Sequence, residues 1–226
     1  MAKSRYFILA IGFLAVIACS EGQGYDISGN WIGYKAARII NKDTMQDNFH
    51  LLLTFRGDSI FVRNFKYIRE GDKDSLSVYS YSIHGDSLIT TDKEGTYFFR
   101  IVEQNSGELV LSTGRTKLFY RKIDNIKAAG PPTDLSKHVY TINRYGKLID
   151  TARFWDNQAV EMYNRALKRP HKGYFYSIKK FAGHELLVID SPQLPVFMIS
   201  QAGEGTFELK KEPLDTAGFL MQEIRR

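Results

Sequence analysis

Few residues in this chain have the chemistry of a nucleophile or of a metal ligand. Cys19 is the only cysteine among the 226 residues, so neither an intramolecular disulfide nor a cysteine-based metal site can form. The five histidines lack the His-x-His or i, i+4 spacing that is typical of metal sites; they are His50, His84, His138, His171 and His184. The sequence therefore predicts no metal and no cofactor.

Ser87 is the serine whose neighbours most resemble a catalytic motif. The segment Gly85-Asp86-Ser87-Leu88 resembles the signature of an esterase family in which this serine is the nucleophile. In that family the motif follows the first strand of an α/β fold and needs a downstream Asp-x-x-His, and none follows Ser87 here. A near copy, Gly57-Asp58-Ser59-Ile60, indicates that both segments are hairpin turns. We therefore predict no catalytic residue and no enzyme, with a hydrolase site discontinuous in sequence as an alternative.

Cys19 itself ends a segment with the three parts of an export signal. Lys3 and Arg5 precede a thirteen-residue uncharged run, 6–18, which is too short to span a bilayer and suits a signal-peptide core. The motif Val16-Ile17-Ala18-Cys19 resembles the lipobox of bacterial lipoproteins. The resemblance implies that 1–18 is a cleaved signal peptide and that Cys19 carries a thioether-linked diacylglycerol. An ordinary secretory signal with an incidental cysteine is the alternative.

This anchor implies a lipoprotein held on a membrane of a Gram-negative cell envelope. Ser20 after Cys19 resembles the pattern that permits transport to the outer membrane, while the periplasmic and the surface-exposed leaflet both remain open. The chain has a net charge of +6, of which Lys3 and Arg5 supply two, and the remainder is spread over both halves. A small positive charge that is spread over an exported protein excludes nucleic acid as a partner.

The first half of the mature chain alternates in period two, which is typical of β-strands. Phe49, Leu51, Leu53 and Phe55, for example, share one face of a strand. Tight turns that contain Gly join the alternating segments and favour an antiparallel meander. Eight strands in about a hundred residues are expected to close into a small barrel, which removes the exposed edges. We expect them at 31–40, 49–56, 59–67, 76–83, 87–92, 95–103, 108–113 and 116–123.

The start of the first strand carries a family motif, Gly29-Asn30-Trp31. Gly-x-Trp at this place resembles the lipocalins and the lipocalin-like bacterial lipoproteins. The resemblance implies that Trp31 closes one end of the barrel and that a cation of the last strand, here Arg121, lies across its indole ring. An ordinary core aromatic is the alternative for Trp31. The domain is shorter than a ligand-carrying lipocalin, which leaves the size of any cavity open.

The run Ala128-Ala129-Gly130-Pro131-Pro132 indicates a stiff linker, because adjacent prolines end strands. We expect a helix over 156–168, since Val160, Tyr163 and Leu167 share one helical face, and strands at 173–180, 185–190, 195–200, 206–211 and 218–224. The segment 174–178 echoes 79–83, so the second half is either a duplicated β unit or unrelated. The domains expected are a tether at 19–24, a lipocalin-like barrel at 25–123, a linker at 124–133 and an α+β domain at 134–226, which makes the protein mainly β.

A basic cluster spans the end of the expected helix and consists of Arg165, Lys168, Arg169, His171 and Lys172. It is either an anionic contact, to lipid headgroups or an acidic glycan, or the solvated end of a helix, where the helix dipole favours cations. The many aromatic residues of the strands either fill a small barrel or line a cavity for an apolar ligand. We favour a non-enzymatic lipoprotein that binds a small apolar ligand or an envelope component. The runner-up is a module that docks an envelope protein through the second domain.

Overall fold

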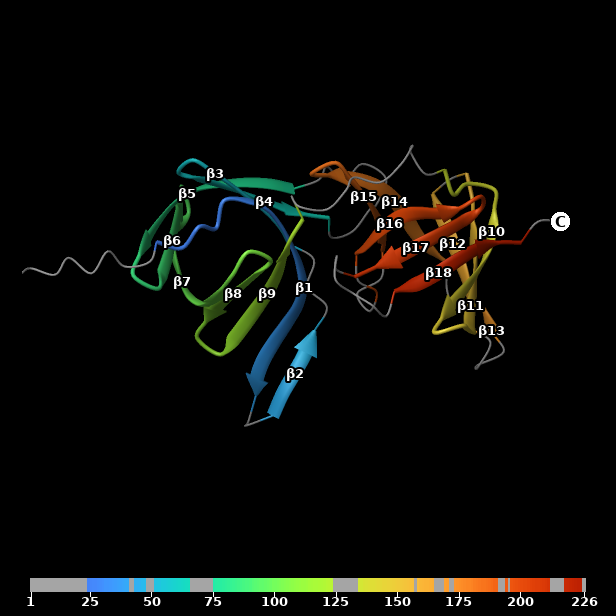
Figure 1. Cartoon of the computed structure of the whole chain (residues 1–226), viewed down its shortest axis with the longest axis horizontal. Helices are drawn as coiled ribbons and strands as arrows, with labels where there is room; N and C mark the ends of the chain where they lie inside the picture. Colours follow the sequence, from blue (N-terminus) through green and yellow to red (C-terminus); the bar gives the residue numbers. More distant parts are fainter. Residues whose placement is uncertain are drawn as a thin grey trace, which may run out of the picture.

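The protein consists of two antiparallel sheets, each closed into an eight-stranded barrel (Figure 1). The structure, a computed structural model, describes residues 24–40, 43–47, 51–65, 75–123, 134–156, 158–164, 169–170, 173–190, 194, 196–211 and 218–224. Among these residues there is no helix, and hence none long and apolar enough to cross a membrane. The export signal, Cys19 and the expected linker 124–133 lie outside the described residues.

The first barrel follows the meander expected from the sequence. Its strands run β1, β3, β4, β5, β6, β7, β8 and β9 in spatial order, and pairing of β1 with β9 closes it. A further strand, β2, pairs with the last five residues of β1, on the edge that β3 leaves free beyond Ile32. The bounds are β1 Gly29–Ile40, β2 Asp43–Asp47, β3 Leu51–Arg56, β4 Ser59–Asn64, β5 Ser75–His84, β6 Ser87–Asp92, β7 Gly95–Gln104, β8 Glu108–Thr113 and β9 Thr116–Lys122.

The second half forms a barrel of the same kind. The strands β10, β11, β12, β14, β15, β16, β17 and β18 follow one another in space, and pairing of β10 with β18 closes the barrel. The two-residue strand β13 adds to the edge of β12. The bounds are β10 Val139–Arg144, β11 Lys147–Phe154, β12 Ala159–Asn164, β13 Arg169–Pro170, β14 Tyr174–Phe181, β15 His184–Ile189, β16 Phe197–Gly203, β17 Thr206–Lys210 and β18 Phe219–Glu223.

The predicted α+β domain with a helix at 156–168 is wrong. Residues 159–164 form β12, which pairs with β11 from Phe154↔Val160 onward. Val160 is buried and Met162 packs against the core, whereas Glu161 is exposed. Burial therefore alternates in period two, and the side chains that fit a helical face instead meet the core from a strand. Closure of the barrel decides the conformation, because without β12 the sheet would be left with open edges.

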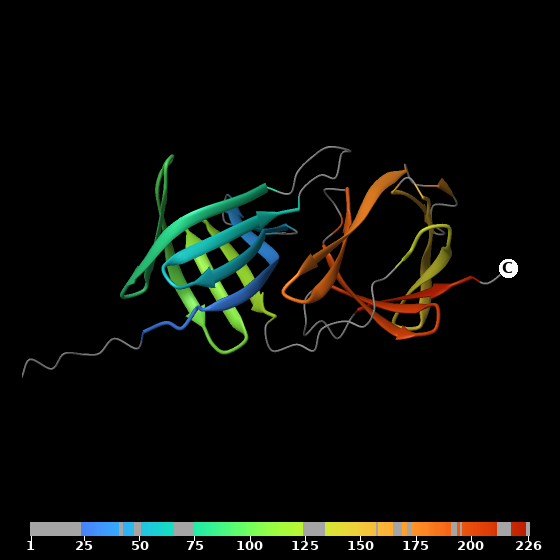
Figure 2. The same cartoon turned by 90° about the horizontal axis from the view of Figure 1, so that it is seen from above.

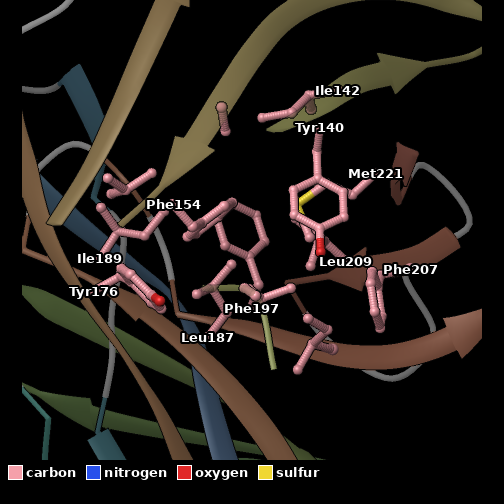
Figure 3. Packing of buried hydrophobic residues seen from close by; sticks show 14 residues of the cluster. Tyr140, Ile142, Phe154, Tyr176, Leu187, Ile189, Phe197, Phe207, Leu209 and Met221 are labelled. Carbon is pink, nitrogen blue, oxygen red and sulfur yellow. The ribbon is translucent and has the colours of Figure 1, made fainter. Parts of the chain in front are cut away.

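Each barrel has its own apolar core. In the second barrel aromatic rings meet edge to face near the centre: Phe154 lies 4.8 Å from Tyr176 and 5.7 Å from Tyr140, between ring centroids (Figure 3). The first core gathers around Trp31, Leu109 and Tyr120. The sequence echo falls on the fourth strand of both barrels, β5 and β14. The echo and the shared meander order agree with a duplicated β unit.

A third apolar cluster lies between the barrels, which stand side by side (Figure 2). Ile32 and Leu52 belong to the outer face of the first barrel, and they pack with Phe181, Leu186 and Val188 of β14 and β15. All are at most 5% exposed. Burial of such side chains stabilises the contact by about 1.5–3 kcal/mol each, so the β14–β15 hairpin is held firmly against β1 and β3.

Candidate functional site

The first barrel contains an apolar cavity of about 190 Å³. Its wall is built from inward-facing side chains of seven strands: Leu51, Leu53, Ile60, Val62, Tyr79, Leu88, Thr90, Tyr97, Phe99, Leu111, Leu118 and Tyr120. Strand alternation selects them, since every second residue of a barrel strand points inward. The aromatic side chains thus fill most of the barrel and leave a space smaller than the roughly 300 Å³ of a drug-sized pocket.

Three tyrosines give this apolar wall its polar character. Tyr79 and Tyr97 meet edge to face at 6.2 Å, and Tyr97 is 43% exposed, which places this pair where the cavity meets solvent. Tyr120 is 2% exposed on the opposite strands, and burial raises the pKa of its hydroxyl far above the usual value. Its hydroxyl therefore stays protonated, and an apolar molecule in the cavity meets no charge from it.

Trp31 lies fully buried in the barrel, and its indole Nε1–H donates to the carbonyl of Ile27 over 2.8 Å. Gly29 begins β1 with φ of 107°, a left-handed conformation that favours glycine. This explains the Gly-x-Trp spacing in backbone terms: the glycine lets the chain turn into β1 two residues before the buried ring.

The cation over Trp31 is Lys122 and not the expected Arg121. The Lys122 ammonium lies 5.4 Å from the indole centroid, and the two residues are direct partners in the β1–β9 register. Arg121 pairs instead with Ile32, on the outer face, where its guanidinium lies 5.4 Å from the Tyr34 ring. Successive residues of a strand point to opposite faces, so only one of these two cations can reach the ring.

The serines of the two hairpin turns are not arranged for catalysis. The Ser59 hydroxyl donates to Asp58 over 3.0 Å, and that of Ser87 donates to Asp86 over 3.5 Å. Elsewhere His138 Nδ1 lies 2.7 Å from Glu223 Oε1, yet no described hydroxyl hydrogen-bonds to this histidine. No group of three or more potential metal ligands occurs among the described residues either.

A family model matches the strands that build the cavity. Residues 27–111 match a lipocalin-like domain. The matched part of the lipocalin-like barrel contains Gly29 and Trp31 and ends within β8, before the closing strand β9. The expected lipocalin-like barrel is thereby confirmed for the first half of the chain. No curated protein matches the chain.

Two solved structures from Bacteroides are also similar to part of this chain. One is a lipocalin-like protein from Bacteroides uniformis ATCC 8492, with 19% identity, a TM-score of 0.35, and coverage of 43% of this chain and 99% of its own. The other is an uncharacterized protein from Bacteroides eggerthii DSM 20697, with 12% identity, a TM-score of 0.36, and coverage of 43% and 100%.

A second hollow opens at one end of the second barrel, where β11 ends and β12 begins. It measures about 1210 Å³ and is lined by Trp155 together with Lys137, His138, Arg153, Asp156 and Glu223. Trp155 is 44% exposed, and the Arg153 guanidinium lies 5.1 Å from its ring centroid. The sequence analysis missed this hollow because it expected a helix from residue 156 in place of the strand β12 that borders the hollow. Trp155, which stands in a charged segment, was a usable signal.

The basic cluster expected at Arg165, Lys168, Arg169 and Lys172 lies outside the described residues, apart from the backbone of Arg169 in β13. Its two interpretations, an anionic contact or a solvated surface, therefore both stay predictions. The helix invoked for the solvated surface does not extend over 159–164, which is strand.

Proposed function

We propose that this protein is a lipid-anchored, non-enzymatic binding protein of a Gram-negative envelope whose lipocalin-like barrel takes up a small apolar molecule. The apolar cavity of about 190 Å³ carries the proposal. An apolar cavity of about 150 Å³ suffices to bind benzene, so the space suits a ligand of that order of size. The motif at Cys19 supports the lipid anchor and the location in the cell envelope. Ser20, which follows Cys19, supports the outer membrane as the membrane that holds the anchor.

The size and the lining of the cavity define the ligand class. The lining residues are mostly alkyl and aryl, and the ones that carry a hydroxyl are Thr90, Tyr79, Tyr97 and Tyr120. Such a wall favours an aromatic or short aliphatic molecule with at most one or two polar atoms. A long acyl chain does not fit a space of this volume.

Filling the cavity tests the proposal. Leu118 is half-buried in the cavity wall, and Leu118→Trp should occupy the space and weaken toluene binding at least tenfold. Leu76→Trp is the matched control, because Leu76 is 50% exposed on the outside of the same barrel. Binding is measured by toluene-dependent shifts of Leu and Ile methyl resonances in the full chain.

Thermal unfolding of both variants shows whether the barrel remains folded, since overpacking costs about 1–3 kcal/mol. Two results would contradict the proposal. In the first, toluene shifts no methyl resonance of the barrel interior; in the second, it binds Leu118→Trp as tightly as it binds the unaltered chain.

The hollow beside Trp155 favours a second candidate function, docking of an envelope protein through the second barrel. Partly exposed tryptophan and arginine side chains are the residues that most often dominate protein interfaces, and Trp155 and Arg153 stack on one another at this surface. A photo-crosslinking residue at position 155 should give one discrete protein adduct in intact cells. The control is position 145, where Tyr145 is 74% exposed outside the hollow; equal adducts from both positions would exclude docking here.

A further inference from the structure

Three cationic residues line a pocket between the two barrels. Arg56 and Arg63 come from β3 and β4 of the first barrel, and Lys180 comes from β14 of the second. The pocket measures about 300 Å³, and Asn30, Thr54, Phe61, Phe181 and Ala182 complete its lining. The volume is about ten times the roughly 30 Å³ share of one water molecule, so it can hold a ligand group of several atoms.

The register of the first barrel dictates that these side chains share one face. Leu53 and Phe55 point into the barrel, so the neighbouring Thr54 and Arg56 point outward. On β4, Ile60 and Val62 line the interior cavity, which leaves Phe61 and Arg63 outside. The pairs Asn30↔Thr54 and Thr54↔Phe61 place the outer residues side by side across three strands.

The second barrel covers this face with a tight hairpin. Ala182 and Gly183 both have positive φ, 49° and 81°, which turns β14 directly into β15. Phe181, at the end of β14, is 5% exposed in the apolar cluster with Ile32 and Leu52. That contact fixes the hairpin at the edge of the pocket, where Lys180 and Ala182 belong to the lining.

Among the residues that the structure describes, no carboxylate forms an ion pair with the three cations of the pocket. Some cations elsewhere are paired, such as Arg100 with Asp86 at 2.6 Å and Lys137 with Asp156 at 3.3 Å. Within the described ranges no ion pair involves Arg56, Arg63 or Lys180. Two carboxylates are close in sequence or register: Asp58, which accepts from Ser59, and Glu185, which pairs with Lys180 in the β14–β15 ladder but is buried.

Like charges held together repel, and their repulsion is relieved when an anion binds between them. Guanidinium groups bind phosphate oxygens through two parallel hydrogen bonds, and an ammonium group contributes a compact charge. Phe61 and Phe181 add apolar surface beside the cations, which suits the organic part of an ester. We propose that the pocket between the barrels binds the phosphoryl group of an organic phosphate monoester. This site is separate from the barrel cavity and does not rest on the proposed function.

Phosphate binding by the full chain in non-ionic detergent tests the proposal. Glycerol 3-phosphate and inorganic phosphate are titrated calorimetrically against the unaltered chain and against the double variant Arg56→Gln, Arg63→Gln. We expect the double variant to bind at least tenfold more weakly. The control, Arg38→Gln with Lys117→Gln, removes the same charge from two exposed cations on β1 and β9, and we expect it to weaken binding by less than twofold.

Further variants and ligands make the result decisive. Lys180→Gln, a substitution in the second barrel, should also weaken phosphate binding several-fold. If the double variant of the first barrel unfolds, this single variant tests the proposal in its place. Vesicles that contain phosphatidic acid are then added to the complex with glycerol 3-phosphate. If they displace glycerol 3-phosphate, the natural ligand is a lipid headgroup; if they do not, it is a soluble ester, and either result supports the site. Acetate binding as tightly as phosphate, an equal loss in the control variant, or no phosphate binding at all would overturn the proposal.

Discussion

Trp31→Ala is expected to lower the free energy of unfolding of the first barrel by about 3–5 kcal/mol, the range for deletion of a large buried side chain. The indole is fully buried, hydrogen-bonded to Ile27 and covered by the Lys122 ammonium. Truncation therefore leaves a cavity, an unpaired carbonyl at Ile27 and an unmatched cation at the barrel end. Urea unfolding followed by circular dichroism measures the loss.

Trp155→Ala is the matched control for this experiment. The chain has two tryptophans, and Trp155 is 44% exposed where Trp31 is fully buried. Surface substitutions usually change stability by no more than about 0.5 kcal/mol. Equal losses from both variants would show that Trp31 does not close the barrel core.

Cys19→Ser is expected to move the protein from the membrane fraction to the soluble fraction, or to leave it uncleaved at this site. The reason is chemical: a serine oxygen cannot form the thioether that the lipobox resemblance implies. Membrane fractionation and the mass of the mature N-terminus measure the effect.

Ser20→Ala is the control for the anchor, because it leaves the thiol of Cys19 in place. This variant should remain in the membrane fraction with its lipid. A Cys19→Ser protein that is processed normally and still sediments with membranes would refute the lipid anchor.

The strands of the first barrel were predictable because the alternation is strong there. β6 and β8 lie at 87–92 and 108–113, the ranges expected from the sequence. β2 was missed because Asp43–Asp47 is polar and lacks alternation. It pairs with the edge of β1 that β3 leaves free beyond Ile32. The first three strands of the second barrel were missed, although Tyr145-Gly146, between alternating runs, was a usable turn signal.

The error at Arg121 shows what the sequence leaves undecided at a site. Arg121 and Lys122 are adjacent cations at the end of β9, and either could reach Trp31 in one register. The observed register pairs Trp31 with Lys122, and shifting it by one residue would exchange the faces of both cations. Only the closed barrel fixes that register.

The sequence by itself determined that the chain is mainly β, that a lipocalin-like barrel begins at Gly29 and that Trp31 belongs in its core, because alternation and tight turns are local properties. The tertiary structure decided the second barrel, where β10 and β18 pair across most of the second half. It also decided the volume of the cavity and the meeting of Arg56, Arg63 and Lys180. These depend on register and on packing between residues far apart in the chain, and local patterns do not encode which distant strand or hairpin becomes a neighbour.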